Sequence, residues 1–143
     1  MNAPINIEEI RRIFLDAPFI AELGIELASA GDGQCETTLE IQPRHLQQDG
    51  FVHAGVQSTM ADHTAGAAAG TLIGPGEIVL TAEFKINLLR PARGDHLVCR
   101  ASVMKPGRTL MVVESAVFCV TDSTETLVSK LMGTMAVVPS RKP

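Results

Sequence analysis

The residues with the clearest chemical potential lie between Gln47 and Asp62, where a polar loop runs directly into an apolar segment. That segment has the pattern of a helix, and the start of a helix carries unpaired backbone N–H groups and the positive end of the helix dipole. The N–H groups near Ala54 and Gly55 are well placed to stabilise an oxyanion. This arrangement suits acyl transfer, in which negative charge develops on a carbonyl oxygen.

Asp62 lies two turns further along the same predicted helix. Residues three and four apart share a helix face. Apart from the carboxylate, this face carries only small side chains, and its members are Gly55, Ser58, Thr59, Ala65, Gly66 and Ala69. A carboxylate in such a face is costly unless it is hydrogen-bonded or performs chemistry. It could attack a thioester carbon directly or activate a water molecule, and the residues alone do not choose between the two.

Simpler structural explanations exist for the neighbouring polar residues. His53 precedes the predicted helix, and bonding to backbone groups there is favoured over a direct chemical role. His63 follows Asp62 but points to another helix face, so no His–Asp dyad is expected. Ser58 and Thr59 lack the GxSxG surroundings of a nucleophile, so we expect them to pack in the helix. The histidines and Asp62 have no convincing metal spacing, and no metal site is predicted.

The elements that must position these residues follow from hydrophobic periodicity. Ile7 to Ala17 has the spacing of an amphipathic helix, which Asn6 could cap together with Glu9. Pro18 either ends this helix or starts a short second turn. A hairpin follows, with its turn at Gly31-Asp32-Gly33.

The segment from Gly55 to about Leu72 is rich in Ala and Gly and free of cations, which predicts a buried, closely packed helix. Four strands are predicted after it, at residues 78–88, 96–104, 109–120 and 127–138. The first has a period of two over eleven residues, and a polar stretch from Thr121 to Glu125 separates the last two. One apolar helix followed by an antiparallel meander predicts an α+β fold. Its sheet wraps around the helix and leaves another helix surface in need of a partner.

Composition narrows the class of protein. The net charge of −4 argues against a general nucleic-acid surface, and no apolar run approaches the roughly 20 residues of a membrane span. The N-terminus lacks the uninterrupted apolar core of a signal peptide. Three cysteines without CxxC spacing are best explained as buried free thiols, which indicates the reducing cytoplasm. With five Phe and no Tyr or Trp, a site that stacks bases on aromatic rings is hard to build.

The run from Gln47 to Asp62, with His53-Ala54-Gly55 nine to seven residues before the acid, resembles the signature of hotdog-fold acyl-CoA thioesterases. The similarity is to the phenylacetate-degradation and 4-hydroxybenzoyl-CoA thioesterase type. Phe84 to Ala92 also resembles that group's third strand and following turn. The resemblance covers about residues 19–138 and implies a single hotdog domain over residues 1–143. In that fold an antiparallel sheet wraps around a long central helix, and here an N-terminal helix precedes it.

By position, the resemblance makes Asp62 the catalytic acid and Ala54 the residue whose N–H polarises the thioester carbonyl, with Gly55 beside it. Gln47 matches a polar residue near the thioester or the attacking water, and His53 matches a histidine that orders the loop. In the family the acid faces the oxyanion donors of a neighbouring subunit. The resemblance therefore implies a homodimer or homotetramer with shared active sites.

One position departs from the family pattern. Some relatives carry Thr one turn after the acid, where this chain has Gly66, and the nearest hydroxyl is that of Thr64. The residue that holds a water molecule beside the acid is therefore left open.

The resemblance also implies where an acyl-CoA substrate lies. The acyl group is expected in a pocket lined by Phe51, Val52, Met60 and partner residues, with coenzyme A running outward to the basic turns. Six of the twelve basic residues fall between Lys85 and Arg108. Arginine binds phosphate well, and the candidates for the phosphates of coenzyme A are Arg90, Arg93 and Arg108.

The sequence therefore predicts an enzyme that hydrolyses an acyl-CoA or aryl-acyl-CoA thioester to the free acid and CoA. No cofactor is expected, because one carboxylate and the oxyanion donors suffice for this chemistry. Two alternatives stay open. A hotdog hydratase or dehydratase would act on the same esters, although its His–Asp pair in a differently spaced motif is not found. A non-catalytic acyl-CoA-binding protein is the other, since motif spacing does not prove turnover.

Overall fold

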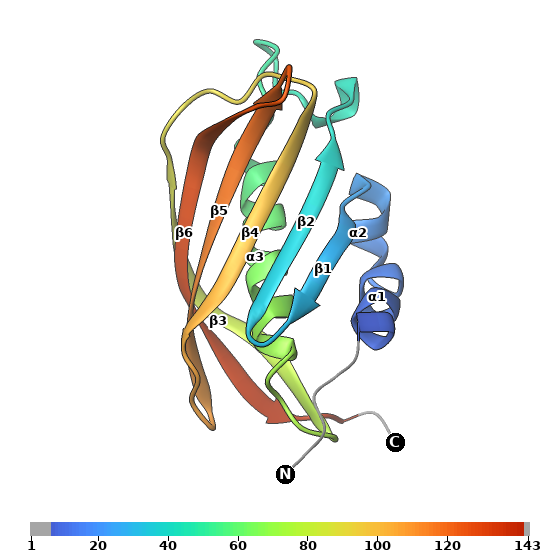
Figure 1. Ribbon diagram of the computed structural model, residues 1–143, viewed down its shortest axis with the longest axis vertical. Coiled ribbons are helices and arrows are strands. Elements are labelled where there is room, and N and C mark those ends of the chain that lie inside the picture. The colour runs from blue at the N-terminus through green and yellow to red at the C-terminus, as the bar shows by residue number, and fades with distance from the viewer. Residues whose placement is uncertain (1–6, 142–143) are drawn as a thin grey trace.

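Two short helices precede the sheet in the computed structural model, which describes residues 7–141 (Figure 1). Helix α1 spans Ile7–Leu15 and α2 spans Pro18–Leu23. Of the two predictions for Pro18, the start of a second helical segment is the one that the structure shows. Proline is tolerated at the first helical position because the N–H that it lacks has no helical partner there. Gly24, in the left-handed conformation with φ of 88°, ends α2. The predicted cap at Asn6 lies outside the described residues.

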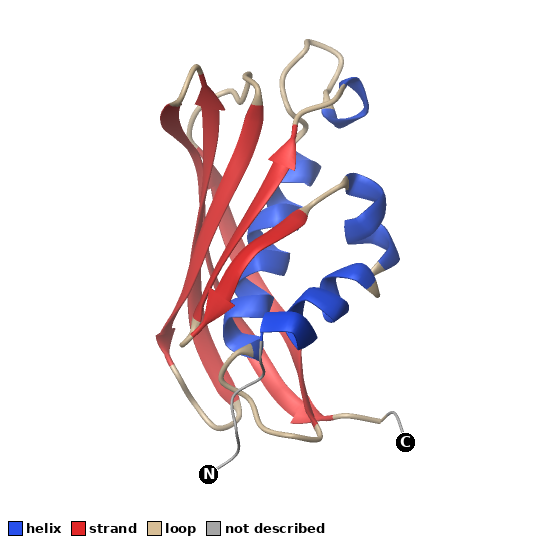
Figure 2. Ribbon diagram, turned by 45° about the vertical axis from the view of Figure 1, so that its right-hand side comes forward, coloured by secondary structure: helices blue, strands red, loops and turns tan. Residues whose placement is uncertain are grey.

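Six antiparallel strands form one sheet in the order β1-β2-β4-β5-β6-β3. They are β1 Glu26–Gly31, β2 Gln34–Glu40, β3 Glu77–Leu88, β4 His96–Lys105, β5 Leu110–Thr121 and β6 Thr124–Pro139. Helix α3, Ala54–Gly70, lies against one face of this sheet, and α1 and α2 lie on the same side (Figure 2). The predicted α+β arrangement of an antiparallel sheet around a central helix is confirmed.

Helix α3 is buried because its side chains are small. Met60, Ala61, Ala65, Ala68 and Ala69 have no exposed area. The sheet can therefore approach the helix backbone closely, and β2, β3, β4 and β5 all contact α3. A hydrogen bond of 2.7 Å between the buried hydroxyls of Thr37 and Thr64 ties β2 to the helix. The predicted burial of this Ala- and Gly-rich segment is confirmed, and the helix starts one residue earlier than expected.

Strand β3 contains a β-bulge that the sequence did not predict. Thr81 pairs with Met135 and Glu83 with Thr134, so Ala82 is an extra residue on β3. One extra residue reverses the alternation of side chains between the two faces. Val79 and Ile86, an odd and an even position, accordingly both pack against the core. The expectation that one apolar series faces one way from residue 78 to 88 is therefore wrong, and Leu80 points outward with 54% of its surface exposed.

The last strand is longer than predicted, whereas β5 keeps its predicted length and is shifted by one residue. Asp122 and Ser123 have positive φ values of 49° and 67° and form a two-residue turn, with Thr121 paired to Thr124. Such turns match the twist of a hairpin. The stretch from Thr121 to Glu125 is therefore mostly strand, and β6 starts three residues before the predicted position.

The two edges of the sheet differ. Strand β1 is short and α1 packs against it, whereas β3 has 12 residues and, among residues 7–141, no segment pairs with its outer edge. None of the described helices is long and apolar enough to span a membrane.

Candidate active site

Asp62 lies half-buried in a hollow of about 320 Å³ between α2, α3 and β3. We call it the acid hollow. Its wall is largely apolar, and besides Asp62 it is formed by Ala17, Phe19, Ile20, Ser58, Thr59, His63 and Phe84. The bulge in β3 matters here, because it brings Thr81 and Phe84 to the same side of the strand, facing α3.

The carboxylate of Asp62 has one hydrogen-bond partner among residues 7–141. The hydroxyl of Thr81 donates to Oδ1 at 2.8 Å, and no described Lys or Arg pairs with this acid. Burial raises the pKa of Asp62, and the hydrogen bond from Thr81 opposes part of that rise. A carboxylate with a raised pKa beside an open hollow is suited to act as a base or nucleophile. Sequence reasoning missed Thr81, because the period of two in β3 grouped it with the polar residues of that strand.

His63 lies next to this acid without bonding to it. Its ring packs edge-on against Phe14, with centroids 4.4 Å apart and planes at 82°. Burial lowers the pKa of His63 to about 4, so the imidazole is neutral near pH 7. Within residues 7–141 it makes no hydrogen bond, which agrees with the prediction that no His–Asp dyad forms.

A second hollow, of about 510 Å³, lies at the N-terminal end of α3. We call it the donor hollow. The loop before α3 forms one wall and the turn after β3 forms the other; the lining comprises Gln47, Gln48, Phe51, Val52, His53, Ala54, Gln57 and residues 88–92. A hydrogen bond of 2.9 Å from the Val52 N–H to the Ala92 carbonyl joins the two walls. Buried His45 anchors the same loop, since its ring bonds the N–H of Gln42 at 3.0 Å and the carbonyl of Leu23 at 2.7 Å.

His53 is the N-cap of α3. Its Nδ1 accepts a hydrogen bond of 2.8 Å from the Gly55 N–H, and a Cβ on residue 55 would lie only 3.0 Å from this nitrogen. This is the backbone-bonding position that the sequence favoured for His53. It also corrects the expectation that Gly55 shares the donor role, because its N–H is already bonded. The N–H of exposed Ala54 has no acceptor among the described residues and stays available.

Gln47 holds the loop with one end of its amide. Its Oε1 accepts hydrogen bonds from the N–H groups of Asp49 and, at 3.4 Å, of Phe51. Its NH2 group makes no hydrogen bond within residues 7–141 and remains available beside the donor hollow. The structure thus brings Gln47, His53 and Ala54 together, as the sequence predicted.

The predicted acyl pocket needs correction. Met60 has no exposed area and Val52 is 3% exposed, so Met60 belongs to the core and Val52 forms only the buried floor of the donor hollow. Phe51 is partly exposed in that hollow. The open apolar surface beside Asp62 comes instead from Phe19 and Phe84.

Within one chain, the three arginines proposed to bind the phosphates of coenzyme A do not lie close together. Arg90 lines the donor hollow and donates to the Leu127 carbonyl at 2.9 Å, and Arg93 is exposed in the same turn. Arg108 lies in the turn after β4, at the other end of this ten-residue strand. A strand of that length spans about 33 Å. The expected basic cluster is therefore split between the two ends of the sheet.

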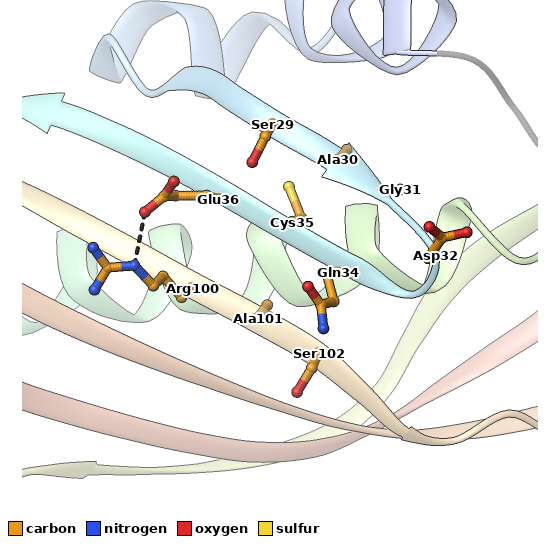
Figure 3. A pocket seen from close by; sticks show the side chains of 10 residues that line it. All are labelled: Ser29, Ala30, Gly31, Asp32, Gln34, Cys35, Glu36, Arg100, Ala101 and Ser102. Carbon is orange, nitrogen blue, oxygen red and sulfur yellow. Dashed lines mark hydrogen bonds and ion pairs between the residues drawn. The ribbon is translucent and has the colours of Figure 1, made fainter.

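A third hollow, of about 490 Å³, lies along β1, β2 and β4 (Figure 3). Arg100 in its wall is neutralised by Glu36 at 2.7 Å and by Glu125 at 2.7 Å. Burial raises the pKa of Cys35 in the same wall to about 12, so this thiol is protonated and unreactive. The wall of this hollow therefore offers neither an unpaired arginine nor a reactive thiol.

The acid and the donors cannot meet within one chain. Asp62 and Ala54 lie in the same helix, eight residues apart. At 1.5 Å per residue, this separates them by about 12 Å along the helix axis. Within one chain, the carboxylate of the acid hollow therefore cannot act on a group that is bound to the Ala54 N–H of the donor hollow.

A family model described as thioesterase superfamily matches residues 49–126. The chain belongs to the thioesterase superfamily. This thioesterase is 32% identical over 120 residues to a 1,4-dihydroxy-2-naphthoyl-CoA hydrolase of Listeria monocytogenes, covering 84% of this chain and 95% of the relative. Its structure matches that of a thioesterase family protein from Silicibacter pomeroyi with a TM-score of 0.89 and 35% identity, over 92% of this chain and 96% of the other.

The fold also matches that of a Haemophilus influenzae thioesterase, with a TM-score of 0.83 over 96% of this chain and 94% of the other. At 23% identity this likeness supports the fold alone. Together with the family match, the similarities confirm the predicted hotdog fold and identify the protein as a thioester hydrolase.

Proposed function

We propose that this thioesterase hydrolyses acyl-CoA or aryl-acyl-CoA thioesters at a site shared between two chains. Asp62 of one chain would act on a thioester whose carbonyl oxygen accepts the Ala54 N–H of the other. The observation that carries the proposal is the division of one site between two hollows, one with a carboxylate of raised pKa and one with a free helix-terminal N–H.

The open edge of β3 supports a homodimer as the minimal assembly. An exposed 12-residue edge strand presents unpaired N–H and C=O groups that a second copy can pair with. A two-fold axis between two β3 strands would run one copy of the sheet antiparallel to the other. Each acid hollow would then approach the donor end of the partner. A homotetramer of two such dimers is compatible with this arrangement.

Two chemical routes fit a carboxylate at this position. As a base, Asp62 would take a proton from water while the water oxygen attacks the carbonyl carbon; the C–S bond then breaks and the proton passes to the CoA thiolate. As a nucleophile, Asp62 would attack the carbonyl carbon and expel the CoA thiolate as the C–S bond breaks, which forms a mixed anhydride; water then cleaves this anhydride to the free acid and the Asp62 carboxylate, and a proton from water ends on the thiolate. The Ala54 N–H would stabilise the oxyanion in both routes. Gln47 would contribute its free NH2 group near the thioester or the water, and His53 would hold the helix end in place.

The surroundings of the two hollows suggest how the substrate lies. The acyl group would occupy the acid hollow beside Phe19 and Phe84, and coenzyme A would run along the donor hollow towards Arg90 and Arg93. We do not retain Arg108 of the same chain. The relative named as a 1,4-dihydroxy-2-naphthoyl-CoA hydrolase makes aromatic acyl groups the first to test.

The remaining expectations stay proposals. The three cysteines are free and buried, which supports the reducing cytoplasm as the location. A single domain over residues 1–143 is also retained. The thioesterase family match and the relative named as a CoA hydrolase favour hydrolysis over the hydratase alternative.

The experiment that tests the function is the substitution Asp62→Asn, assayed by thiol release on a panel of aryl and aliphatic CoA esters. We expect the variant to lose at least about 10²-fold in kcat, since it removes the acting carboxylate. Asp122→Asn is the matched control, because Asn tolerates the left-handed turn at that position equally well. Light scattering checks that the assembly is intact. Full activity in Asp62→Asn would reject the assignment.

A further inference from the structure

We infer that Thr81 is a positioning residue that fixes the orientation of Asp62, holding one carboxylate oxygen and leaving the other for the reaction. The inference rests on the proposed function of Asp62 and adds to it a residue on a different element. Its basis is the geometry of β3 at the bulge.

The contact between the two side chains is direct. The Thr81 hydroxyl lies 2.8 Å from Oδ1 of Asp62 and 3.5 Å from Sδ of Met135. Met135 is fully buried and pairs with Thr81 across β3 and β6, so the threonine side chain is backed by the core. A carboxylate is a much stronger acceptor than a thioether, so the hydroxyl proton is directed to Asp62.

The bulge is what makes this contact possible. With regular alternation, positions 81 and 84 would lie on opposite faces of β3. The extra residue Ala82 places Thr81 against Asp62 while Phe84 still lines the acid hollow. Bulges commonly re-aim a side chain next to a functional site.

No other hydroxyl in the described chain does the same for Asp62. Gly66, one helical turn later, has no side chain, and a Cβ there would meet nothing within 4 Å. Thr59, one turn earlier, donates to the Gly55 carbonyl at 2.8 Å, and Thr64 bonds Thr37 and the Met60 carbonyl. The hydroxyl that some relatives carry on the helix is therefore replaced by one from the strand.

The hydrogen bond also sets the basicity of the acid. Besides Asp62, the wall of the acid hollow holds one titratable side chain, the neutral His63, and no cation. On β3 the nearest charged group is Glu83, which accepts a hydrogen bond of 2.6 Å from Thr134. Thr81 is thus the main group that opposes the effect of burial on Asp62. Without its hydroxyl, the carboxylate becomes more basic and its free oxygen less well oriented.

The test measures kcat/KM against pH for Thr81→Val, Thr81→Ser and the wild type, with the best ester of the panel. In Thr81→Val we expect the acid limb of the profile to move up by about one pH unit, because a hydrogen bond to a charged group is lost. On the alkaline plateau we expect a roughly tenfold fall in kcat from the looser orientation. Thr81→Ser keeps the hydroxyl and should restore both properties.

Thr134→Val is the matched control, since it removes a threonine hydroxyl that donates to Glu83 at 2.6 Å in the same part of the sheet. It should leave the profile unchanged. The inference would be overturned if Thr81→Val kept the wild-type pH profile of kcat/KM and the wild-type kcat on the plateau. It would also be overturned if Thr81→Ser did not restore both properties. If Thr81→Val fails to assemble in light scattering, the pair Thr81→Ala and Thr81→Ser decides by the same criteria. Activity retained in Asp62→Asn would overturn the proposed function instead.

Discussion

The acid hollow and the donor hollow lie on one helix and differ in almost every property. The first is apolar, contains one carboxylate with a raised pKa, and holds no cation in its wall. The second is formed by a polar loop, a free helix-terminal N–H and an arginine. Each alone lacks what thioester hydrolysis needs, because the oxyanion and the attacking group must lie within a few ångströms of one carbonyl.

The rigid helix explains why the halves stay apart. Within α3 no side-chain rotation can close about 12 Å between Ala54 and Asp62. In the proposed dimer, a second copy related by a two-fold axis would bring a donor end to each acid without changing either chain. If the proposed function holds, this division means that only an assembly of chains can hydrolyse a thioester.

The largest effect is expected when the acid hollow and the donor hollow are disabled in separate chains. Ala54→Pro removes the backbone N–H that would stabilise the oxyanion. Proline is tolerated at this position because Ala54 is the first residue of α3. The preceding residue, His53, has φ −59° and ψ 140°, a conformation that is compatible with a following proline. Loss of one oxyanion donor costs about 10²–10³ in kcat. Asp62→Asn removes the other half. A mixture refolded or co-expressed from both inactive variants should regain about a quarter of wild-type activity, since half of the dimers are mixed and carry one intact site.

Two results would contradict the shared site. The mixture would stay inactive if acid and donor came from the same chain. Ala54→Gly, which keeps the N–H, should stay close to the wild type, and a loss in that control as large as in the proline variant would remove the backbone donor from the mechanism. The measurement is thiol release at equal total protein, with mixed dimers counted by differently tagged chains.

The sequence predicted the order of the elements because the long segments have a clear period. Helix α3 and strands β4 and β5 follow their patterns to within one or two residues. The bulge in β3 could not be read from β3 itself, because apolar and polar residues alternate through it from Leu80 to Leu88. Next to the bulge, β6 approaches β3 closely, since a Cβ on Gly133 would lie 2.7 Å from the Glu83 carbonyl oxygen. A lone glycine inside a predicted strand was the available signal.

The candidate site shows the same limit. Gln47, His53 and Ala54 were grouped correctly because they are neighbours in one loop. Thr81 was missed because its contact with Asp62 depends on the register between β3 and β6, which no local pattern contains. Arg108 was grouped with Arg90 and Arg93 by sequence position, yet an entire strand separates it from them.

A smaller effect is expected from His53, which caps the helix end in the donor hollow. His53→Ala removes the N-cap of α3 and should lower the free energy of unfolding by about 1 kcal/mol. Activity should fall as well, because the helix end that presents the Ala54 N–H loses its anchor. His53→Asn supplies another cap acceptor and should restore both stability and activity. Urea unfolding and the thiol assay measure the two effects. If His53→Asn were stable but inactive, the imidazole of His53 would instead take part directly in the reaction.

The smallest effect concerns the stability of the acid side. Burial raises the pKa of Asp62 in the folded state, so between its unfolded and folded pKa values the folded protein binds more protons than the unfolded chain. Stability should therefore fall as pH rises through this window, because the ionised carboxylate is costly in the hollow. Asp62→Asn removes the cost and should show a slightly higher Tm than the wild type at pH 7, with a difference that shrinks as pH falls through the raised folded pKa and is absent below about pH 4. Thermal unfolding at a series of pH values measures it. A variant less stable than the wild type at pH 7 would show that the carboxylate stabilises the fold, which would argue for a structural rather than a catalytic Asp62.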